Sequence, residues 1–270
     1  MRRWLGAAIA VALLAAGALA LVAVIGSDDD GSDPRRRAEW LGTDPLTVGV
    51  ACRGLHPIDG RPTTFTCRPR QGRSFAIVRV LRGERVPLRS RPGGPAVLTI
   101  GPRTEFDSPR SYAVVQRRGP WLGVATPLRP NGVLGWLRYD SRSLWLYWTR
   151  YSLHADLARQ RVELRYGGRV LDRFPVSVGA AGTSTPPGRF AITDGLVYED
   201  SPYYGCCALA LSGRQPNLPP GWLGGDRIAI HGTSGPVGWA ASSGCLRANN
   251  ADMLDLMRRV PLGAPVFIRE

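Results

Sequence analysis

Two residues of reactive type, His231 and Cys245, stand fourteen positions apart near the end of the chain. Ile228 and Ile230 alternate with smaller or polar neighbours, which predicts a short half-buried strand that ends at His231, before a glycine-containing turn. Cys245 follows a second glycine-containing turn. A thiol and an imidazole held at such turns can act as nucleophile and general base. The alternative is structural: the thiol packs as a small hydrophobe and the imidazole is a hydrogen-bonded core group.

The residues after Cys245 carry a helical pattern. Apolar side chains recur so as to predict an amphipathic helix over 251–260, with Asn249 near its start and Pro261 at its stop. Cys245 would then lie just ahead of a helix N-terminus. The helix dipole, nearby backbone N–H groups and Arg247 would together lower the thiol pKa from ~8.5 toward or below neutrality.

A longer pattern surrounds the two reactive residues. His231-Gly232-Thr233, followed by Ser242-Ser243-Gly244-Cys245-Leu246-Arg247, resembles the active-site signature of the YkuD-type L,D-transpeptidases, bacterial enzymes that cross-link peptidoglycan. Upstream, residues 174–179 (FPVSVG) and 185–190 (TPPGRF) resemble the "fPVSxG" and "TPxGxF" segments of the same family. The resemblance covers 144–270.

The match departs from the family pattern at two places. The family often carries His, Lys or Arg where Ser243 stands, and the loop between His231 and Ser242 is short here. Both departures concern how substrate is held, so they leave the expected chemistry unchanged.

The resemblance implies acyl transfer between the peptide stems of peptidoglycan. The thiolate of Cys245 would attack the carbonyl of the L-centre residue in a tetrapeptide stem, expel D-alanine and leave a thioester. His231, with an ordinary pKa of ~6.5, would take the thiol proton and then give it to the leaving amine. The side-chain amine of a second stem would resolve the thioester. The sequence contains no HExxH, phosphate-loop or dinucleotide motif, so no metal and no cofactor is expected.

Five further residues complete the predicted site. The family orients its histidine with a backbone carbonyl, which at the matching position is that of Gly232. Backbone N–H groups at Gly244 and at the nucleophile would hold the oxyanion, each contributing about 3–4 kcal/mol, and Ser242 would help to orient this turn. Arg247 is expected to hold either the turn or a substrate carboxylate, and Ser243 to contact substrate.

Two rival functions use the same sequence features. An L,D-carboxypeptidase would employ Cys245 and His231 with water as the acceptor, and the sequence does not separate transfer from hydrolysis. A non-catalytic wall-binding protein would be expected to have lost one of these residues or the Ser242-x-Gly244 turn. Because all are present, the sequence disfavours the binding protein.

The chain begins with a candidate membrane segment, 1–26. Arg2 and Arg3 precede an uncharged apolar run over 4–25, which is long enough to cross a hydrocarbon layer of roughly 30 Å as a helix. The run continues past a cleavage-like Ala18-Leu19-Ala20, so an uncleaved anchor is favoured over a signal peptide. The charge asymmetry places the remainder on the extracytoplasmic face of the cell membrane, or in the wall if the segment is cleaved.

The formal net charge of +14 comes from arginine, since the chain contains no lysine. GC-rich coding explains this composition as well as attraction to anionic wall polymers or lipid headgroups does. Nucleic acid is not an expected partner, because an exported chain rarely meets it and the arginines do not cluster on one motif.

Residues 27–74 are predicted to form a spacer with little to bury. In an oxidising exterior, Cys52 and Cys67 would pair as a disulfide that closes a loop rich in proline and arginine. A zinc site that adds His56 to them would lack a fourth ligand, so it is disfavoured.

Short alternating runs broken by glycine and proline fill 75–142, which predicts a small all-β barrel. Its "V-x-LRSxPGG", "W-L-x-V" and "G-W-L" pieces resemble a bacterial SH3-like domain, a family often attached to wall enzymes. Trp121 and Trp136 are interpreted as core and rim aromatics rather than ligand-stacking residues.

The second half, 144–270, is expected to be a mixed-β catalytic domain with few helices, so the whole chain is mainly β. It contains a hairpin over 153–166, the helix described above and a last strand over 264–268. His154 on the hairpin is expected to be a surface residue without a catalytic role. Cys206 and Cys207 could form a vicinal disulfide, pair separately or stay as thiols, and the sequence does not choose.

Overall fold

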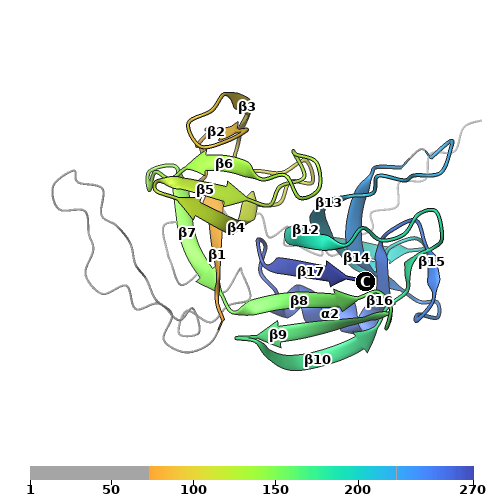
Figure 1. Ribbon diagram of the computed structural model, residues 1–270. Coiled ribbons are helices and arrows are strands. Elements are labelled where there is room, and N and C mark those ends of the chain that lie inside the picture. The colour runs from red at the N-terminus through yellow and green to blue at the C-terminus, as the bar shows by residue number, and fades with distance from the viewer. Residues whose placement is uncertain (1–72, 223) are drawn as a thin grey trace, which may run out of the picture. The chain divides into compact units, whose positions relative to one another are not determined.

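The computed structural model describes residues 73–222 and 224–270 (Figure 1). The predicted anchor at 1–26, almost all of the spacer and the Cys52–Cys67 loop lie outside the described residues. All of the described residues belong to one compact unit. Within 73–222 and 224–270, no helix is long and apolar enough to cross a membrane.

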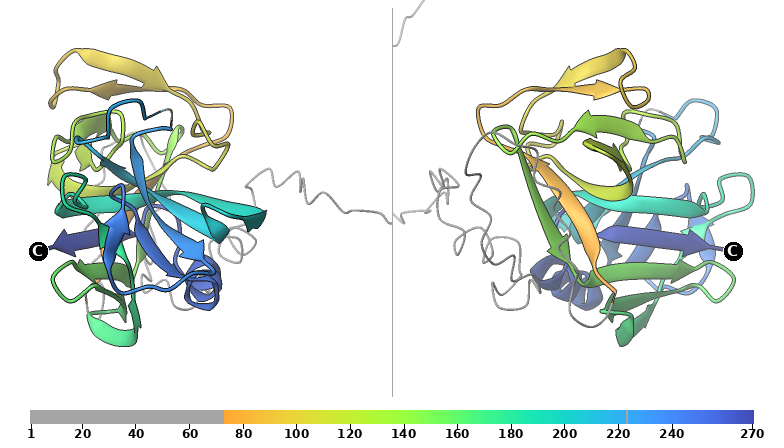
Figure 2. Two further views of the ribbon diagram at one scale, coloured as in Figure 1. Left: turned by 90° about the vertical axis from the view of Figure 1, so that its right-hand side faces the viewer. Right: turned by 60° about the vertical axis from the view of Figure 1, so that its left-hand side comes forward.

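The first sheet is antiparallel and has the strand order β3-β2-β6-β5-β4-β1-β7. Its strands are β1 (Phe75–Val80), β2 (Val86–Arg89), β3 (Ala96–Ile100), β4 (Ser111–Arg118), β5 (Trp121–Val124), β6 (Gly135–Arg138) and β7 (Leu144–Thr149). These confirm the short strands predicted over 75–142 from alternating residues. β7 pairs with β1 along its whole length, so the residues at the start of the predicted catalytic segment belong to this sheet (Figures 1 and 2).

The second sheet is mixed and has the strand order β10-β9-β8-β17-β12-β13-β14-β16. Its strands are β8 (Tyr151–Asp156), β9 (Arg161–Tyr166), β10 (Arg169–Pro175), β12 (Gly188–Ser201), β13 (Gly205–Arg214), β14 (Arg227–Thr233), β16 (Leu246–Asn249) and β17 (Pro265–Arg269). β11 (Val178–Gly179) and β15 (Ala240–Ser242) form a separate parallel pair. The expected hairpin, last strand and mixed-β character are confirmed.

One helix, α2 (Asn250–Arg259), packs against β13, β14 and β16 (Figure 1). It buries Met253 and Leu256 in the core of the second sheet, and two arginines lie in its last turn, where cations suit the helix dipole. The helix predicted over 251–260 is thus confirmed to within one residue at each end. The fold as a whole is mainly β with few helices.

Two local predictions about the reactive residues are wrong. His231 lies inside β14, which continues to Thr233, rather than at the strand end. Cys245 precedes β16, so four strand residues separate it from α2, and the dipole of that helix does not act at its thiol. Residues 246–249 alternate apolar and polar side chains over only four positions, the shortest run from which a strand is predicted.

Candidate active site

The catalytic candidates are placed by two neighbouring parallel strands. β14 pairs with β16 in a register that sets Ile230 beside Leu246 and His231 beside Arg247. One step back along both strands, Cys245 falls level with Ala229. Because side chains alternate between the two faces of a strand, His231, Cys245 and Arg247 project on the same face of the sheet.

A cavity of about 570 Å³ opens on this face. His231, Cys245, Arg247, Ser242 and Ser243 all line it. The structure therefore brings five of the seven predicted site residues to one cavity. Gly232 and Gly244 adjoin it through the backbone of the same two segments.

His231 is almost fully buried, and its Nδ1 lies 2.9 Å from the carbonyl oxygen of Gly232. A carbonyl can only accept, so Nδ1–H donates and Nε2 carries the lone pair that a general base needs. The edge of the Tyr204 ring meets the imidazole at a centroid distance of 5.2 Å and an interplanar angle of 81°. Burial lowers the pKa of His231 from its usual 6.5, the Gly232 hydrogen bond opposes that change, and Arg247 adds to it.

Burial raises the pKa of the Cys245 thiol above its usual 9.0, while a backbone hydrogen bond with Ala229 and the charge of Arg247 act in the opposite direction. The lowered thiol pKa predicted from a helix dipole is therefore wrong, because a strand rather than a helix follows the nucleophile. With the thiol pKa raised and the His231 pKa lowered, both groups are neutral at neutral pH. Such a pair creates its thiolate only as the proton moves to the imidazole.

The turn before the nucleophile is held by Ser242. Its hydroxyl donates to the Cys245 carbonyl oxygen at 2.5 Å and accepts from the Gly244 N–H at 3.1 Å. Gly244 has φ +114°, a conformation that side chains with a Cβ rarely adopt. The N–H of Gly244 would exchange its bond to Ser242 for an oxyanion during catalysis.

Gln215, which the sequence did not single out, supports this turn from the loop after β13. Its buried amide nitrogen lies within hydrogen-bond distance of the carbonyl oxygens of Thr183, Ser184 and Ser243, at 2.9, 3.1 and 3.2 Å. A Cβ at Gly244 would meet the same nitrogen at 2.1 Å. Gln215 therefore joins the 183–185 segment to the nucleophile turn. No local signal in the sequence reveals a contact across such separations.

The two upstream motifs are joined to each other, and Ser177 and the intervening Thr183 join them to the segment 242–247. Thr183 donates from its hydroxyl to the carbonyl oxygen of Ser242 at 3.0 Å, and Thr185 accepts from the N–H of Gly179 at 2.9 Å. Ser177 exchanges two backbone hydrogen bonds with Arg247. The FPVSVG and TPPGRF segments are thus a brace behind the catalytic residues.

Arg247 has an unpaired nitrogen at the cavity. Its Nε is buried and has no hydrogen-bond partner among the described residues. Its backbone, in contrast, is fixed on both sides by Ser177 and β14. The turn therefore does not depend on the Nε group, and the Arg247 side chain contributes a positive charge to the lining of the cavity.

The other cysteines and the second histidine lie apart from this arrangement. Cys206 and Cys207 are free thiols, as is Cys245, so the vicinal disulfide does not form. Burial raises the pKa of Cys207 to about 12. His154 stacks on Phe267 at 4.7 Å and is absent from the lining of the catalytic cavity. Burial lowers the pKa of His154 to about 4, so it is not the simple surface residue predicted.

Among the residues that the structure describes, no group of three His, Cys, Asp or Glu side chains could hold a metal ion.

Comparison with known proteins matches the second half of the chain to one family. The YkuD family model, an L,D-transpeptidase catalytic domain, matches residues 150–268. The chain is 31% identical to the L,D-transpeptidase YkuD of Bacillus subtilis over 124 residues, which are 45% of this chain and 68% of that protein. It is 32% identical to the Bacillus licheniformis protein of the same name over 120 residues, 44% of this chain and 65% of that protein.

Among solved structures, an L,D-transpeptidase from Mycobacterium smegmatis aligns with 53% of this chain and 76% of its own, at 18% identity and a TM-score of 0.36. The chain spans about two thirds of the length of the two Bacillus relatives.

The sequence matches show the family. This chain belongs to the L,D-transpeptidases of the YkuD family, and it is an acyltransferase of peptidoglycan. The matched segment begins at Arg150, between β7 and β8, so it contains β8 to β17 and nearly all of the catalytic sheet.

Proposed function

We propose that Cys245 is the nucleophile of this L,D-transpeptidase and His231 its general base. The observation that carries the proposal is the register of β14 and β16, which sets both side chains on one face of the sheet and in one cavity. The hydrogen bond from Nδ1 to Gly232 fixes the tautomer that leaves Nε2 as an acceptor.

The reaction starts from the neutral pair. As Sγ of Cys245 attacks the carbonyl carbon of the L-centre residue in a tetrapeptide stem, its proton moves to Nε2 of His231. A tetrahedral oxyanion forms and is held by backbone N–H groups at Gly244 and Cys245. When the C–N bond breaks, the imidazolium gives its proton to the departing amine of D-alanine, and a thioester remains on Sγ.

Transfer repeats these steps in reverse order. The side-chain amine of a second stem attacks the thioester carbonyl and gives a proton to His231, which passes it to the departing Sγ of Cys245 as the C–S bond breaks, so that the free thiol is regenerated. The new amide joins the two stems. Arg247 and Ser243 line the cavity beside this centre, and the positive charge of Arg247 suits a substrate carboxylate.

An L,D-carboxypeptidase is the alternative, with water in place of the second amine. The same residues would serve, because a water molecule attacks the same thioester. Transfer is favoured because the relatives that this chain matches are L,D-transpeptidases.

The first sheet is proposed to be the bacterial SH3-like domain that its motifs indicate. Support comes from its short antiparallel strands, a core of its own, and tryptophans that do not form an open stacking surface. Trp136 is buried under the guanidinium of Arg118, and Trp121 is half-buried with Arg89 at 5.8 Å from its ring. A wall polymer would therefore contact this domain mainly through arginine.

The proposed location is the extracytoplasmic face of the cell membrane. The apolar run over 4–25 and the arginines before it motivate an N-terminal anchor, and the net charge of +14 suits an anionic wall. Recovery of the full-length chain in the membrane fraction would support the anchor. A mature chain that starts near Leu21 would contradict it.

The function is tested by incubating the purified protein with disaccharide-tetrapeptide muropeptides and identifying products by mass spectrometry. Transfer gives a cross-linked dimer and releases D-alanine, whereas hydrolysis gives a trimmed monomer. Cys245→Ala is the control and should give neither product. A dimer formed equally by wild type and Cys245→Ala would overturn the proposed nucleophile.

A further inference from the structure

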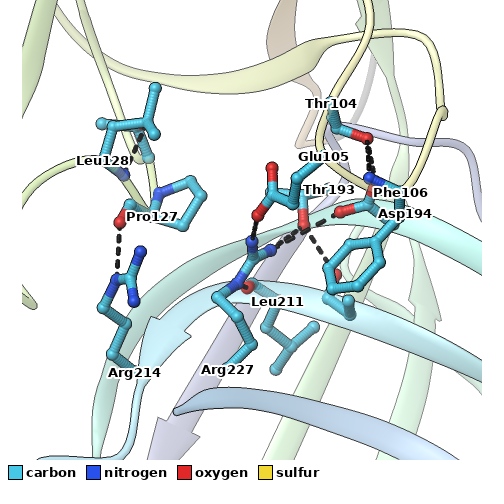
Figure 3. Close-up of polar contacts among 12 residues, drawn as sticks. Thr104, Glu105, Phe106, Pro127, Leu128, Thr193, Asp194, Leu211, Arg214 and Arg227 are labelled. Carbon is cyan, nitrogen blue, oxygen red and sulfur yellow. Dashed lines mark hydrogen bonds and ion pairs between the residues drawn. The ribbon is translucent and has the colours of Figure 1, made fainter. Parts of the chain in front are cut away.

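One loop of the first sheet lies on the catalytic sheet. It joins β3 to β4 over residues 101–110, and Figure 3 shows its contacts with β12 and β14. The hydroxyl of Thr104 donates to Asp194 on β12, and the carboxylate of Glu105 pairs with Arg227, the first residue of β14. The loop is thus fastened to the strand that carries His231.

Buried charge makes this attachment specific. Asp194 is fully buried, and the side chain of Arg227 is only 10% exposed. Arg227 lies 3.5 Å from the Asp194 carboxylate and also donates to the carbonyl oxygen of Leu211 at 2.9 Å and to the hydroxyl of Thr193 at 2.5 Å. A buried guanidinium that is paired with one buried and one partly exposed carboxylate tolerates few other arrangements, because loss of the buried partner leaves a charge unpaired.

The loop is also rigid within itself. Thr104 accepts from the N–H groups of Phe106 and Ser108 at 3.3 and 3.1 Å, and its own N–H donates to the Ser108 carbonyl oxygen at 2.9 Å. Arg110 closes the base of the loop with a bond from Nε to the carbonyl oxygen of Gly101 at 2.9 Å. The backbone position of Phe106 at the loop tip is therefore held before any ligand arrives.

Phe106 lies at the boundary of two cavities. Its ring lines the catalytic cavity, and it also lines a second cavity of about 420 Å³ between this loop and α2. The side chain is 43% exposed, and the Arg227 guanidinium lies 5.8 Å from the ring centroid (Figure 3). A rigid aromatic ring exposed to a reaction cavity offers apolar contact area at little entropic cost.

We infer that the first sheet completes the substrate site, with Phe106 as a specificity-determining residue that packs against an apolar part of a peptide substrate. Glu105 and Thr104 are the positioning residues that hold its loop. The inference rests on the proposed function, because the substrate is the peptide stem that this function names. It gives the first sheet a role in the reaction itself, in addition to any contact with wall polymer.

The test separates substrate binding from the reactivity of the thiol. In Phe106→Ala, we expect KM for the donor or the acceptor stem to rise about tenfold, with kcat changed less than about threefold, as suits loss of one aromatic contact. The rate at which iodoacetamide, a small uncharged reagent, alkylates Cys245 should stay within about twofold of wild type, since it needs no such contact. Phe106→Leu keeps an apolar wall and should restore most of the KM.

The matched control is Leu98→Ala on β3. Leu98 is 39% exposed on the same sheet and lines neither cavity, so its loss should leave both KM values unchanged. If wild type turns over and Phe106→Ala has both KM values of wild type, the inference is overturned while the function stands. It is equally overturned if the alkylation rate falls as far as kcat/KM does, because the loop would then only support β14. A wild type inactive on every stem peptide would overturn the proposed function, and this inference with it.

Discussion

The two ends of β14 treat buried polar groups in opposite ways. At Arg227 the buried group stays charged, because Asp194 and Glu105 supply carboxylates and two further oxygens accept hydrogen bonds from it. Four residues further on, His231 is as deeply buried but has a single carbonyl as its partner, and burial lowers its pKa. Burial thus fixes charge where partners are present and keeps a group neutral where they are absent.

This contrast assigns different tasks to the two ends. The ion pairs of Arg227 with Asp194 and Glu105 hold one geometry and do not easily exchange protons. They therefore suit the attachment of the first sheet to the catalytic sheet. A neutral imidazole beside a neutral thiol has little to hold it, but it can move a proton within the pair. The variants below are ordered by the size of the effect expected when either task is removed.

The largest effect is expected at the neutral end. His231→Ala should slow the acylation of Cys245 by a carbapenem-type probe by about 100-fold or more, because the thiol loses the base that lines the same cavity. Peptide mapping by mass spectrometry should find the adduct at Cys245 alone. His154→Ala is the matched control and should label at the wild-type rate, since His154 packs on Phe267 outside the cavity. An adduct on Cys206 or Cys207, or fast labelling of His231→Ala, would contradict the assignment.

Much of the neutral end could be predicted from the sequence. The residues His231 and Cys245 stand in local motifs, and the strand of one and the glycine turn of the other follow from short-range patterns. The thiol pKa could not be predicted, because it depends on whether strand or helix follows Cys245. Four residues of β16 decide that question, and they become a strand only through pairing with β14.

The charged end could not be predicted. Glu105, Asp194 and Arg227 are far apart in the sequence, and each resembles an ordinary surface residue in its own segment. Gln215 and Phe106 share this property, because their contacts join loops of different strands. Patterns of hydrophobicity locate elements, but they do not show which side chains of separate loops meet.

The second largest effect is expected on stability, when the ion pairs of Arg227 at the start of β14 are broken. Asp194→Asn should lower the free energy of unfolding by about 3 kcal/mol, because Arg227 stays buried with one carboxylate fewer. Urea denaturation of the full chain measures it. Asp107→Asn is the matched control, since Asp107 pairs with Arg103 on the surface with both side chains more than half exposed, and it should cost less than about 1 kcal/mol. Equal losses in the two variants would show that the buried network does not fasten the loop.

A smaller effect is expected at Gln215, which supports the turn before Cys245. Gln215→Met keeps the length of the side chain but removes the donor shared by three carbonyl oxygens, so the nucleophile turn loosens. We expect kcat for thioester formation to fall about tenfold with KM nearly unchanged, since the turn presents the oxyanion donors. Asn217→Ala, an exposed change two residues away, should leave kcat intact. An increase in KM alone would instead place Gln215 among the substrate contacts.

The smallest effect is expected from pH. For His231 the folded pKa is below its usual 6.5, so the imidazole stays neutral, and able to accept a proton, as pH falls through that value. For Cys245 the pKa is above its usual 9.0, so the thiolate does not accumulate as pH rises to that value. Between pH 6.5 and pH 9.0, kcat/KM should change less than about twofold. It should fall only below pH 6.5, where the imidazole of His231 becomes protonated.

Stopped-flow acylation with a carbapenem-type probe across this range, together with the ultraviolet absorbance of the thiolate, tests this expectation. A thiolate–imidazolium pair would instead show thiolate absorbance at neutral pH, and a bell-shaped profile bounded by the two members of the pair. His231→Ala separates the cases further. In the neutral pair its residual rate should rise with pH up to the raised thiol pKa, because attack then waits for spontaneous ionisation. A residual rate that is flat from neutral pH upward would mean that Cys245 is already ionised. Burial would then not raise the pKa of its thiol.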